Sequence, residues 1–584
     1  MANRRDAWIC LLAVGICSCL AVDFPDNKGK KFVVLFQDND PSTEPVELFL
    51  TTTEKVVEAK VSAPLLAERG SRPHVEPKTV KVTRGEITSV TLNNRLRLKG
   101  TKKENKGILI EATGEVIVYG ANRGSFSTDA FLCLPVDILG TQYYAPSWPK
   151  KDRYIGPQIG VVAVEDGTRV TFTFPNDNRN ISVSYDGRTY VDGSTLQVSL
   201  DKYETFHVQN EADLTGTKII STKPIAVTSG NKRTKVGFLT SSDHLVEMIP
   251  PVSTWGKKFV TVPIAKRKVG DIFRIIASKQ NTVISVRGTV NTTVHNYTVD
   301  QGQYLDLDVA SDEFLYIHSS NAILINQLCK TAYSDNTDPF MMYLPPVEQF
   351  SGAYTFATVK SSYISYKNFV NIVIKTTEIK GLVLDGSPIK KDAFVGNWTV
   401  IAGTEYSGNT IAVSRGTHSL YHESPIVSFA AFLYGMTNQE SYGYPAGTRL
   451  ASIGDSCIKS KSPDYADGKD NDCDGRIDEE IPNGVDDDGD GIIDEDLAYG
   501  SGEKWVPGNN DNTDFDIKFA ARKQEEERKT VTIALGTSIP AVALIALGIL
   551  LYLLYRKKRG NNQQQALVPE SGGPPGNPPA AEAW

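Results

Sequence analysis

The feature that most constrains the fold of this chain is an internal repeat between residues 31 and 447. A phrase made of Pro-Val, then a glycine, then an aromatic residue begins at Pro135, Pro251 and Pro346, with similar apolar runs before and after each copy. The period is roughly 95–115 residues, and a fixed period of this kind predicts an array in which each unit packs against its neighbours.

The repeated segment predicts strands rather than helices. Its apolar runs are short, alternating and rich in β-branched residues, as at 168–174 and 282–286. Turn residues separate them, as at Asp186-Gly187 and Asp385-Gly386. With about eight such runs in each period, we expect an all-β region over residues 22–449.

Two architectures fit about eight strands per period. Each period could form two four-stranded blades of about 50 residues, which gives a seven- or eight-bladed β-propeller. Alternatively, each period could form one β-sandwich in a tandem string. Small, evenly sized sheets and the lack of a Cys…Trp…Cys framework favour the propeller.

Three phrases carry a resemblance to a known family: IISTKPIAVTSGNK at 219–232, FRIIASKQNTVISV at 273–286 and YLPPVEQFSGAYTF at 343–356. They resemble the N-terminal domain family of the IgG Fc-binding protein, over about residues 100–445. The resemblance implies a secreted or surface β-rich recognition module, and it assigns no residue of this chain to Fc binding. The resemblance does not extend to mucin-like polymerisation, because this chain has seven cysteines instead of the family's many cysteine-rich repeats.

Two apolar segments predict a type I membrane protein. Residues 531–555 carry no charged side chain, and about 20 apolar residues suffice for a transmembrane helix. Arg4 and Arg5 precede a short apolar run, which predicts a signal peptide over 1–21. We therefore expect an extracellular ectodomain at the plasma membrane, a polar spacer at 498–530, and a disordered cytoplasmic tail at 556–584.

Cysteines and glycosylation sequons agree with an extracellular location. Removal of the signal peptide leaves Cys133, Cys329, Cys457 and Cys473, and four cysteines allow two disulfides in three pairings. The short separation of Cys457 and Cys473 favours a local bond, which leaves Cys133 to pair with Cys329. N-x-[ST] sequons predict glycans at Asn180, Asn291, Asn296 and Asn397.

An acidic segment over residues 450–497 predicts calcium binding. Residues 464–496 contain 15 acidic and 2 basic side chains, and alternate aspartates on a tight loop suit Ca²⁺, which takes oxygen ligands. Gly475 and Gly491 allow the sharp turns, while Ile481 and Leu497 replace the usual last ligand, so the segment resembles thrombospondin type 3 loops. The expected ligands form two sets: Asp470, Asp472, Asp474 and Asp478, and Asp486, Asp488, Asp490 and Asp494.

The sequence contains none of the common catalytic motifs. It has no G-x-S-x-G, H-E-x-x-H or phosphate-binding loop, and its lysines and arginines are scattered. His418 and His422 lie in a strand-like run, so we expect surface or packing histidines rather than a zinc pair. Leu307-Asp308-Val309 is likewise expected in a strand rather than in an integrin-binding loop.

These observations predict a cell-surface adhesion or recognition receptor with a calcium-binding stalk, and no enzyme. Its expected partner is an extracellular protein or glycan, and no nucleic acid. The alternative is a structural component of an extracellular matrix or coat that binds calcium.

Overall fold

The computed structural model describes residues 25–67, 74–151, 156–237, 241–331, 338–360, 364–424 and 426–453, with 464–465 and 496–497. The predicted signal peptide, spacer, transmembrane helix and tail lie outside these residues, as do Cys457, Cys473 and all the predicted calcium ligands. Within the described ranges, no helix is long and apolar enough to cross a membrane.

The prediction of an all-β region is confirmed, and the strands form four repeats. The first contains β1 (Gly29–Val34), β2 (Val46–Thr51), β3 (Val56–Ser62), β4 (Lys78–Thr83), β5 (Thr88–Leu92), β7 (Ile108–Gly124) and β8 (Ser127–Leu132). The second contains β9 (Gln142–Tyr144), β10 (Pro157–Ala163), β11 (Thr168–Thr173), β14 (Thr195–Leu200), β15 (Thr205–Gln209), β16 (Lys218–Ser221), β17 (Ile225–Thr234) and β18 (Asp243–Met248). A hairpin of β12 (Ser182–Tyr185) and β13 (Arg188–Val191) is inserted there, and β6 (Lys102–Glu104) pairs with β15.

The third and fourth repeats follow the same order. The third contains β19 (Gly256–Val260), β20 (Asp271–Ala277), β21 (Thr282–Gly288), β22 (His295–Val299), β23 (Tyr304–Val309), β24 (Leu315–Cys329) and β25 (Met341–Leu344). The fourth contains β26 (Ala353–Ala357), β27 (Lys367–Lys375), β28 (Leu382–Leu384), β29 (Ser387–Pro388), β30 (Thr399–Val400), β31 (Tyr406–Val413), β32 (Thr417–His422), β33 (Ala430–Thr437) and β34 (Glu440–Pro445). Outside the repeats, β35 (Asp464–Tyr465) pairs in parallel with β36 (Asp496–Leu497).

Short 3₁₀ turns connect the strands. They are η1 (Pro64–Leu66), η2 (Asn94–Leu96), η3 (Val136–Ile138), η4 (Val252–Thr254), η5 (Val347–Gln349), η6 (Thr376–Gly381) and η7 (Lys391–Ala393). Three of them, η3, η4 and η5, begin at the valine of the repeated Pro-Val phrase. The phrase therefore marks the same link between strands in three repeats.

Strand pairing is the same in every repeat. The second strand lies between two others: β2 pairs with β5 and β7, β10 with β15 and β17, β20 with β23 and β24, and β27 with β31 and β33. The next strand also lies between two others: β3 pairs with β4 and β7, β11 with β14 and β16, β21 with β22 and β24, and β28 with β29 and β32. The repeats are therefore copies of one topology.

The first and third repeats each contain one long strand that is shared by two four-stranded layers. Its first half in β7 pairs with β1 and β3, and its second half pairs with β2 and β8. One strand thus belongs to both layers, and seven strands join in a single curled sheet. In the second repeat, Pro224 separates β16 from β17, because proline cannot donate to a strand ladder, and the layers become separate sheets.

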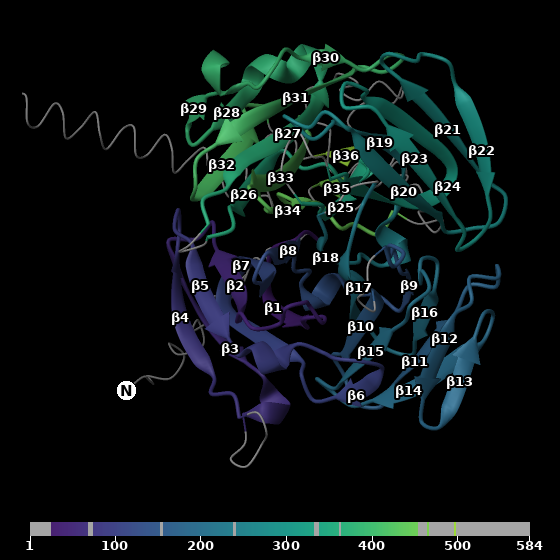
Figure 1. Cartoon of the computed structure of the whole chain (residues 1–584). Coiled ribbons are helices and arrows are strands. Elements are labelled where there is room, and N and C mark those ends of the chain that lie inside the picture. The colour runs from purple at the N-terminus through teal and green to yellow at the C-terminus, as the bar shows by residue number, and fades with distance from the viewer. Residues whose placement is uncertain are drawn as a thin grey trace, which may run out of the picture. The chain divides into compact units, whose positions relative to one another are not determined.

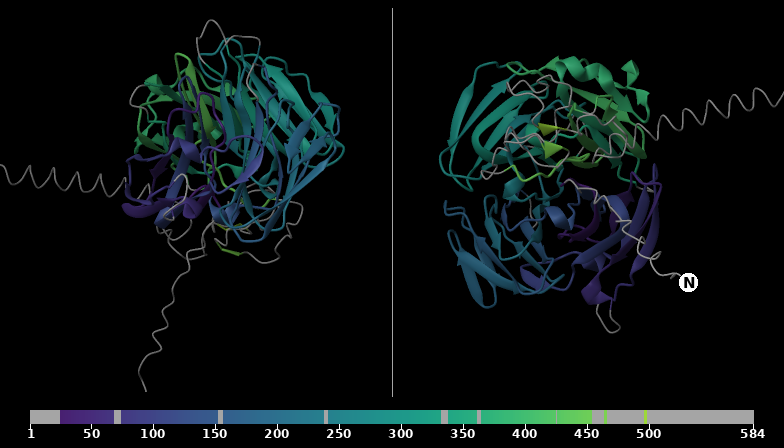
Figure 2. Two further views of the ribbon diagram at one scale, coloured as in Figure 1. Left: turned by 60° about the horizontal axis from the view of Figure 1, so that its bottom comes forward. Right: turned by 180° about the vertical axis from the view of Figure 1, so that it is seen from behind.

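The last strand of each repeat lies at a common centre. β8 contacts β18 and β34, and β25 also contacts β18 and β34, so the four strands follow one another in a closed ring. Figure 1 shows these strands between the four groups of strands, and Figure 2 shows the same groups from two other sides. The last repeat therefore contacts the first, and the choice between a propeller and tandem sandwiches stays a prediction.

Buried aromatic pairs join neighbouring repeats. Tyr119 of β7 packs on Tyr444 of β34 with ring centroids 4.7 Å apart. Tyr144 of β9 packs near Trp255 at 6.0 Å, beside the start of the third repeat. Phe340 stacks on Tyr434 of β33 at 6.1 Å. The apolar core is therefore shared between repeats rather than enclosed within each one.

Close contacts between glycine and proline explain the repeated phrase. A Cβ atom built on Gly140 would lie 2.6 Å from Cβ of Pro251, and one on Gly256 would lie 2.5 Å from Cβ of Pro346. The beginning and end of a repeat can meet only because the glycine lacks that atom. In the fourth repeat, the N-terminal segment takes part instead, since the Leu450 N–H donates to the carbonyl oxygen of Pro25 at 2.7 Å.

Candidate functional site

The central strands meet at one buried carboxylate, that of Asp129 in β8. Its Oδ2 accepts hydrogen bonds from the backbone N–H of Val246 in β18 at 3.1 Å and of Met341 in β25 at 3.4 Å. Burial raises the pKa of Asp129, and backbone donors that include Gly443 of β34 lower it. One side chain of the first repeat therefore connects the last strands of the other three.

Four further carboxylates lie on or beside the central strands. They belong to Asp243 and Glu247 in β18, to Asp338 just before β25, and to Glu440 in β34. None of the four is more than 3% exposed. Three repeats thus contribute buried acidic groups to the same centre as Asp129.

These acidic groups bind protons more tightly than carboxyl groups in water. Burial, the largest cause, raises the pKa of Glu440 to about 8 and that of Asp338 to about 6. Burial also raises the pKa of Asp243 well above its ordinary value, and the charges of Glu440, Asp338 and Asp129 add to this effect. Glu440 is therefore mostly protonated at neutral pH.

Hydrogen bonds of this cluster also connect neighbouring repeats. The backbone N–H of Tyr343 in β25 donates to Glu247 Oε1 at 3.0 Å, so this carboxylate also joins two repeats. Arg267 Nη2 donates to the carbonyl oxygen of Asp338 at 2.8 Å. Among the described residues, no group of three or more histidine, cysteine, aspartate or glutamate side chains could hold a metal ion.

The turn that precedes Asp129 presents an aromatic side chain to solvent. Phe126, between β7 and β8, is 66% exposed. Its backbone φ is +57°, a left-handed conformation that costs an L-residue roughly 1–2 kcal/mol. Exposure of a large apolar group and backbone strain therefore coincide at one residue.

The segment at 39–44 holds this turn in place. Asn39 Nδ2 donates to the carbonyl oxygens of Asn122 at 2.8 Å and Ser127 at 2.7 Å, on either side of the turn. The hydroxyl of Ser125 lies 3.4 Å from both Thr43 Oγ1 and Glu44 Oε1. Hydrogen bonds thus hold the backbone on both sides of Phe126.

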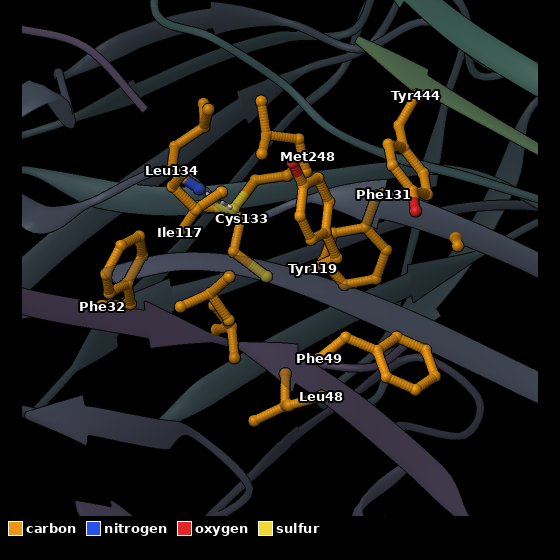
Figure 3. Close-up of a cluster of buried hydrophobic side chains, with 14 of the residues drawn as sticks. Phe32, Leu48, Phe49, Ile117, Tyr119, Phe131, Cys133, Leu134, Met248 and Tyr444 are labelled. Atoms are coloured by element: carbon orange, nitrogen blue, oxygen red, sulfur yellow. Dashed lines mark hydrogen bonds between the residues drawn. The ribbon is translucent and has the colours of Figure 1, made fainter. Parts of the chain in front are cut away.

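The predicted bond between Cys133 and Cys329 is not formed, and both side chains are buried thiols. Cys133 packs among Phe32, Met248 and other apolar side chains near the first repeat, as Figure 3 shows. Cys329 belongs to a different core cluster, between the third and fourth repeats. Pairing by elimination failed because each thiol serves as a small apolar core residue.

The four predicted glycosylation sites are all exposed. Asn180 precedes β12, Asn291 and Asn296 lie around the start of β22, and Asn397 precedes β30. The first repeat contains no N-x-[ST] sequon. Exposure is what glycosylation requires, and occupancy of these sites stays a prediction.

The histidine pair and the Leu-Asp-Val tripeptide, which the sequence did not favour as binding sites, both lie in strands. His418 and His422 both lie in β32, where His418 Nδ1 contacts Asp385 Oδ2 at 2.8 Å and His422 Nε2 contacts the carbonyl oxygen of Glu378 at 2.8 Å. Leu307-Asp308-Val309 forms part of β23. The predicted placement of both segments in strands is therefore confirmed.

Sequence reasoning missed the central carboxylates and Phe126. The available signal was an acidic residue inside an apolar strand, such as Asp129 in STDAFL or Glu247 in DHLVEM. Phe126 carried no local signal beyond its position between Ser125 and Ser127. Its exposure and positive φ are visible only in three dimensions.

Comparison with known proteins supplies the family. Residues 129–435 match the family described as IgGFc binding protein. A human protein named IgGFc-binding protein is 23% identical over 449 residues, which are 76% of this chain and 8% of the human protein. Among solved structures, a GH78 family rhamnosidase of Bacillus sp. GL1 is 10% identical, covers 58% of this chain and 55% of its own, and has a TM-score of 0.11.

The matched region begins at Asp129, the carboxylate at the centre, and ends in β33, within the last repeat. It covers more than half of the 584 residues. This chain belongs to the IgGFc-binding protein family.

Proposed function

We propose that this chain is an extracellular recognition protein that binds a protein ligand through the turn between β7 and β8. The observation that carries the proposal is Phe126, which is exposed and strained at the same time. A glycine or asparagine at this position would avoid the strain. The side chain therefore fits a binding role better than a role in folding.

The rigidity of the turn adds to this support. A ligand that takes up an aromatic ring gains most when the ring is already positioned, because less conformational freedom is lost on binding. Asn39 and the segment at 39–44 supply that order. Aromatic residues are also frequent among the few that contribute most of the binding energy of an interface.

The IgG Fc fragment is the first ligand to test, because the human relative is named an IgGFc-binding protein. Cells that display the full chain should bind Fc, and Phe126→Gly should weaken binding at least tenfold. Val400→Ala provides a matched control, since Val400 is a 57% exposed apolar residue of the fourth repeat. Equal loss in both variants would contradict a specific role for Phe126, and a glycan array with the same variants tests the other ligand class.

We also propose that residues 531–555 anchor the chain in the plasma membrane, with the repeats outside the cell. The signal sequence at 1–21 and the uncharged segment support this topology. Protease treatment of intact cells should remove an epitope tag placed after residue 21 and leave a tag at residue 584 protected. Protection of the first tag would contradict it.

Calcium binding by the acidic segment is a third part of the proposal. The parallel pairing of β35 with β36 brings Asp464 opposite Asp496, at the two ends of the predicted loops. Residues 464 and 496 therefore lie side by side, as they would if the loops between them closed around bound ions. Calorimetry should detect saturable binding of about two Ca²⁺ ions at extracellular concentrations, and Asp470→Ala with Asp486→Ala should abolish it.

A further inference from the structure

Three exposed valines of the third repeat, Val283, Val290 and Val294, are here called the apolar strip. Val290 is 68% exposed, Val294 is 48% exposed and Val283 is 42% exposed. Val283 lies in β21, while Val290 and Val294 lie in the connection to β22. β22 is the terminal strand of its sheet, and an unpaired strand edge can pair with another chain.

Strand register places Asn296 on the same face as Val283, one residue of this strip. Ser285 of β21 is opposite Asn296, and Val283 is opposite Thr298. Residues directly and diagonally opposite on one face have side chains roughly 5–8 Å apart. Asn296 is thus a diagonal neighbour of Val283 and lies two residues from Val294.

Hydrogen bonds leave Asn296 suited to carry a glycan. The Ser285 hydroxyl is 2.7 Å from Asn296 Oδ1, so the carbonyl end of the amide faces the sheet. An N-linked glycan attaches to the other end, the amide nitrogen. The side chain is exposed, so a sugar there would project over the outer face of β21 and β22.

The second sequon of this repeat lies beside the most exposed valine. Asn291 follows Val290 directly, and the backbone N–H groups of both residues donate to the carboxylate of Glu313, at 3.0 Å from Val290 and 3.4 Å from Asn291. This anchored turn keeps Asn291 next to the apolar strip. Two of the four sequons of the chain thus lie within the same short stretch as the exposed valines.

The other sequons follow the same pattern. Asn180 lies at the base of the β12–β13 hairpin, where Asp192 accepts its backbone N–H at 2.9 Å beside Val191, which is 52% exposed. Asn397 lies three residues before Val400 in β30, which is also a terminal strand. The first repeat, which presents Phe126, has exposed apolar residues but no sequon.

We propose that N-linked glycans on Asn291 and Asn296 cover the apolar strip and the free edge of β22, and so prevent self-association through this edge. The occupant of the surface is the chain's own glycan. Both sequons lie at the strip, and one of them is on the exposed face itself. The same arrangement leaves the surface around Phe126 uncovered.

The test is to remove both glycans in a secretory eukaryotic host, with the full chain purified in mild detergent. Asn291→Gln with Asn296→Gln should lose mass for two glycans and should self-associate to dimers or larger species in light scattering. Thr293→Ala with Thr298→Ala removes the same sequons but keeps both asparagines, and should behave in the same way. Thermal unfolding of each variant checks that the repeats remain folded.

A rescue variant tests whether association of the glycan-free chain is caused by the apolar strip or by another effect of glycan loss. Addition of Val290→Thr and Val294→Thr to the glycan-free chain should restore the dispersed state, because these changes keep side-chain volume and remove apolar surface. The proposal is overturned if the wild-type sites carry no glycan, if the glycan-free chain stays dispersed, or if the threonine changes leave its association unaltered.

Discussion

At the scale of single residues, the centre of the repeats is governed by the cost of burying charge. Glu440 is 2% exposed, and Asp243, one of its neighbours, is fully buried. Two carboxylates in such surroundings cannot both be ionised cheaply. Buried carboxyl groups in this part of the core are therefore neutralised by protonation rather than by a nearby cation. The free energy of unfolding thus depends on pH.

We predict that Glu440→Gln changes this link. The pKa of Glu440 is about 8 in the folded chain and about 4.5 when unfolded. The contribution of this group to the free energy of unfolding is therefore fully present below pH 4.5 and is lost as pH rises towards 8. Glutamine does not titrate. Urea unfolding should show similar stability of variant and wild type at pH 5, and a more stable variant at pH 8.5 by on the order of a few kcal/mol.

The variant must be compared with the wild type at each pH, because buried histidines change the stability of the fold with pH in the opposite direction. Burial lowers the pKa of His207 to about 4 and that of His244 to about 3, so both reduce stability as pH falls below about 6.5. These contributions cancel in the difference. A variant whose advantage is the same at both pH values would contradict the assignment to Glu440.

We predict that Phe126→Gly keeps or raises stability although it removes a large side chain. Relief of the positive φ offsets the greater freedom of glycine in the unfolded chain, so the free energy of unfolding should be unchanged or rise by up to about 1 kcal/mol. Phe126→Asn, which tolerates this backbone, should behave similarly. Chemical denaturation measures both, and a loss above about 1 kcal/mol would show that the ring supports the fold.

At the scale of elements, the contact between glycine and proline at the ends of a repeat gives a third prediction. Gly140→Ala would place Cβ 2.6 Å from Cβ of Pro251, and such overpacking typically costs 1–3 kcal/mol. Gly396→Ala is the control, because nothing lies within 4 Å of its added Cβ. Thermal unfolding should show a lower midpoint for the first variant alone, and equal midpoints would contradict a closed contact.

The sequence predicted the strands and their period because both depend on local patterns. Alternation in TLQVSL or TVISVRG identifies a strand without any knowledge of its partner. It could not predict that β7 serves both layers, since this depends on distant strands that pair with its two halves. For the same reason the central carboxylates were missed, because Asp129 meets its partners only after four repeats close.

At the scale of the whole molecule, shared cores predict that the repeats do not unfold one at a time. Tyr444 of the fourth repeat is buried against Tyr119 of the first, and its hydroxyl donates to the carbonyl oxygen of Ala357 at 2.7 Å. Tyr444→Ala should leave a cavity that costs roughly 3–5 kcal/mol. Because the cavity borders two repeats, both should lose protection.

Hydrogen exchange followed by mass spectrometry can locate this loss. If the ring of repeats opens as one unit, amides of β7 and β33 should exchange faster by a similar factor, on the order of 10²–10³. Val400→Ala changes an exposed residue of the fourth repeat and should leave both strands unaffected. Faster exchange in β33 alone would instead mean that the repeats open independently. The contacts at the centre would then hold the repeats together, but each repeat would unfold with its own free energy.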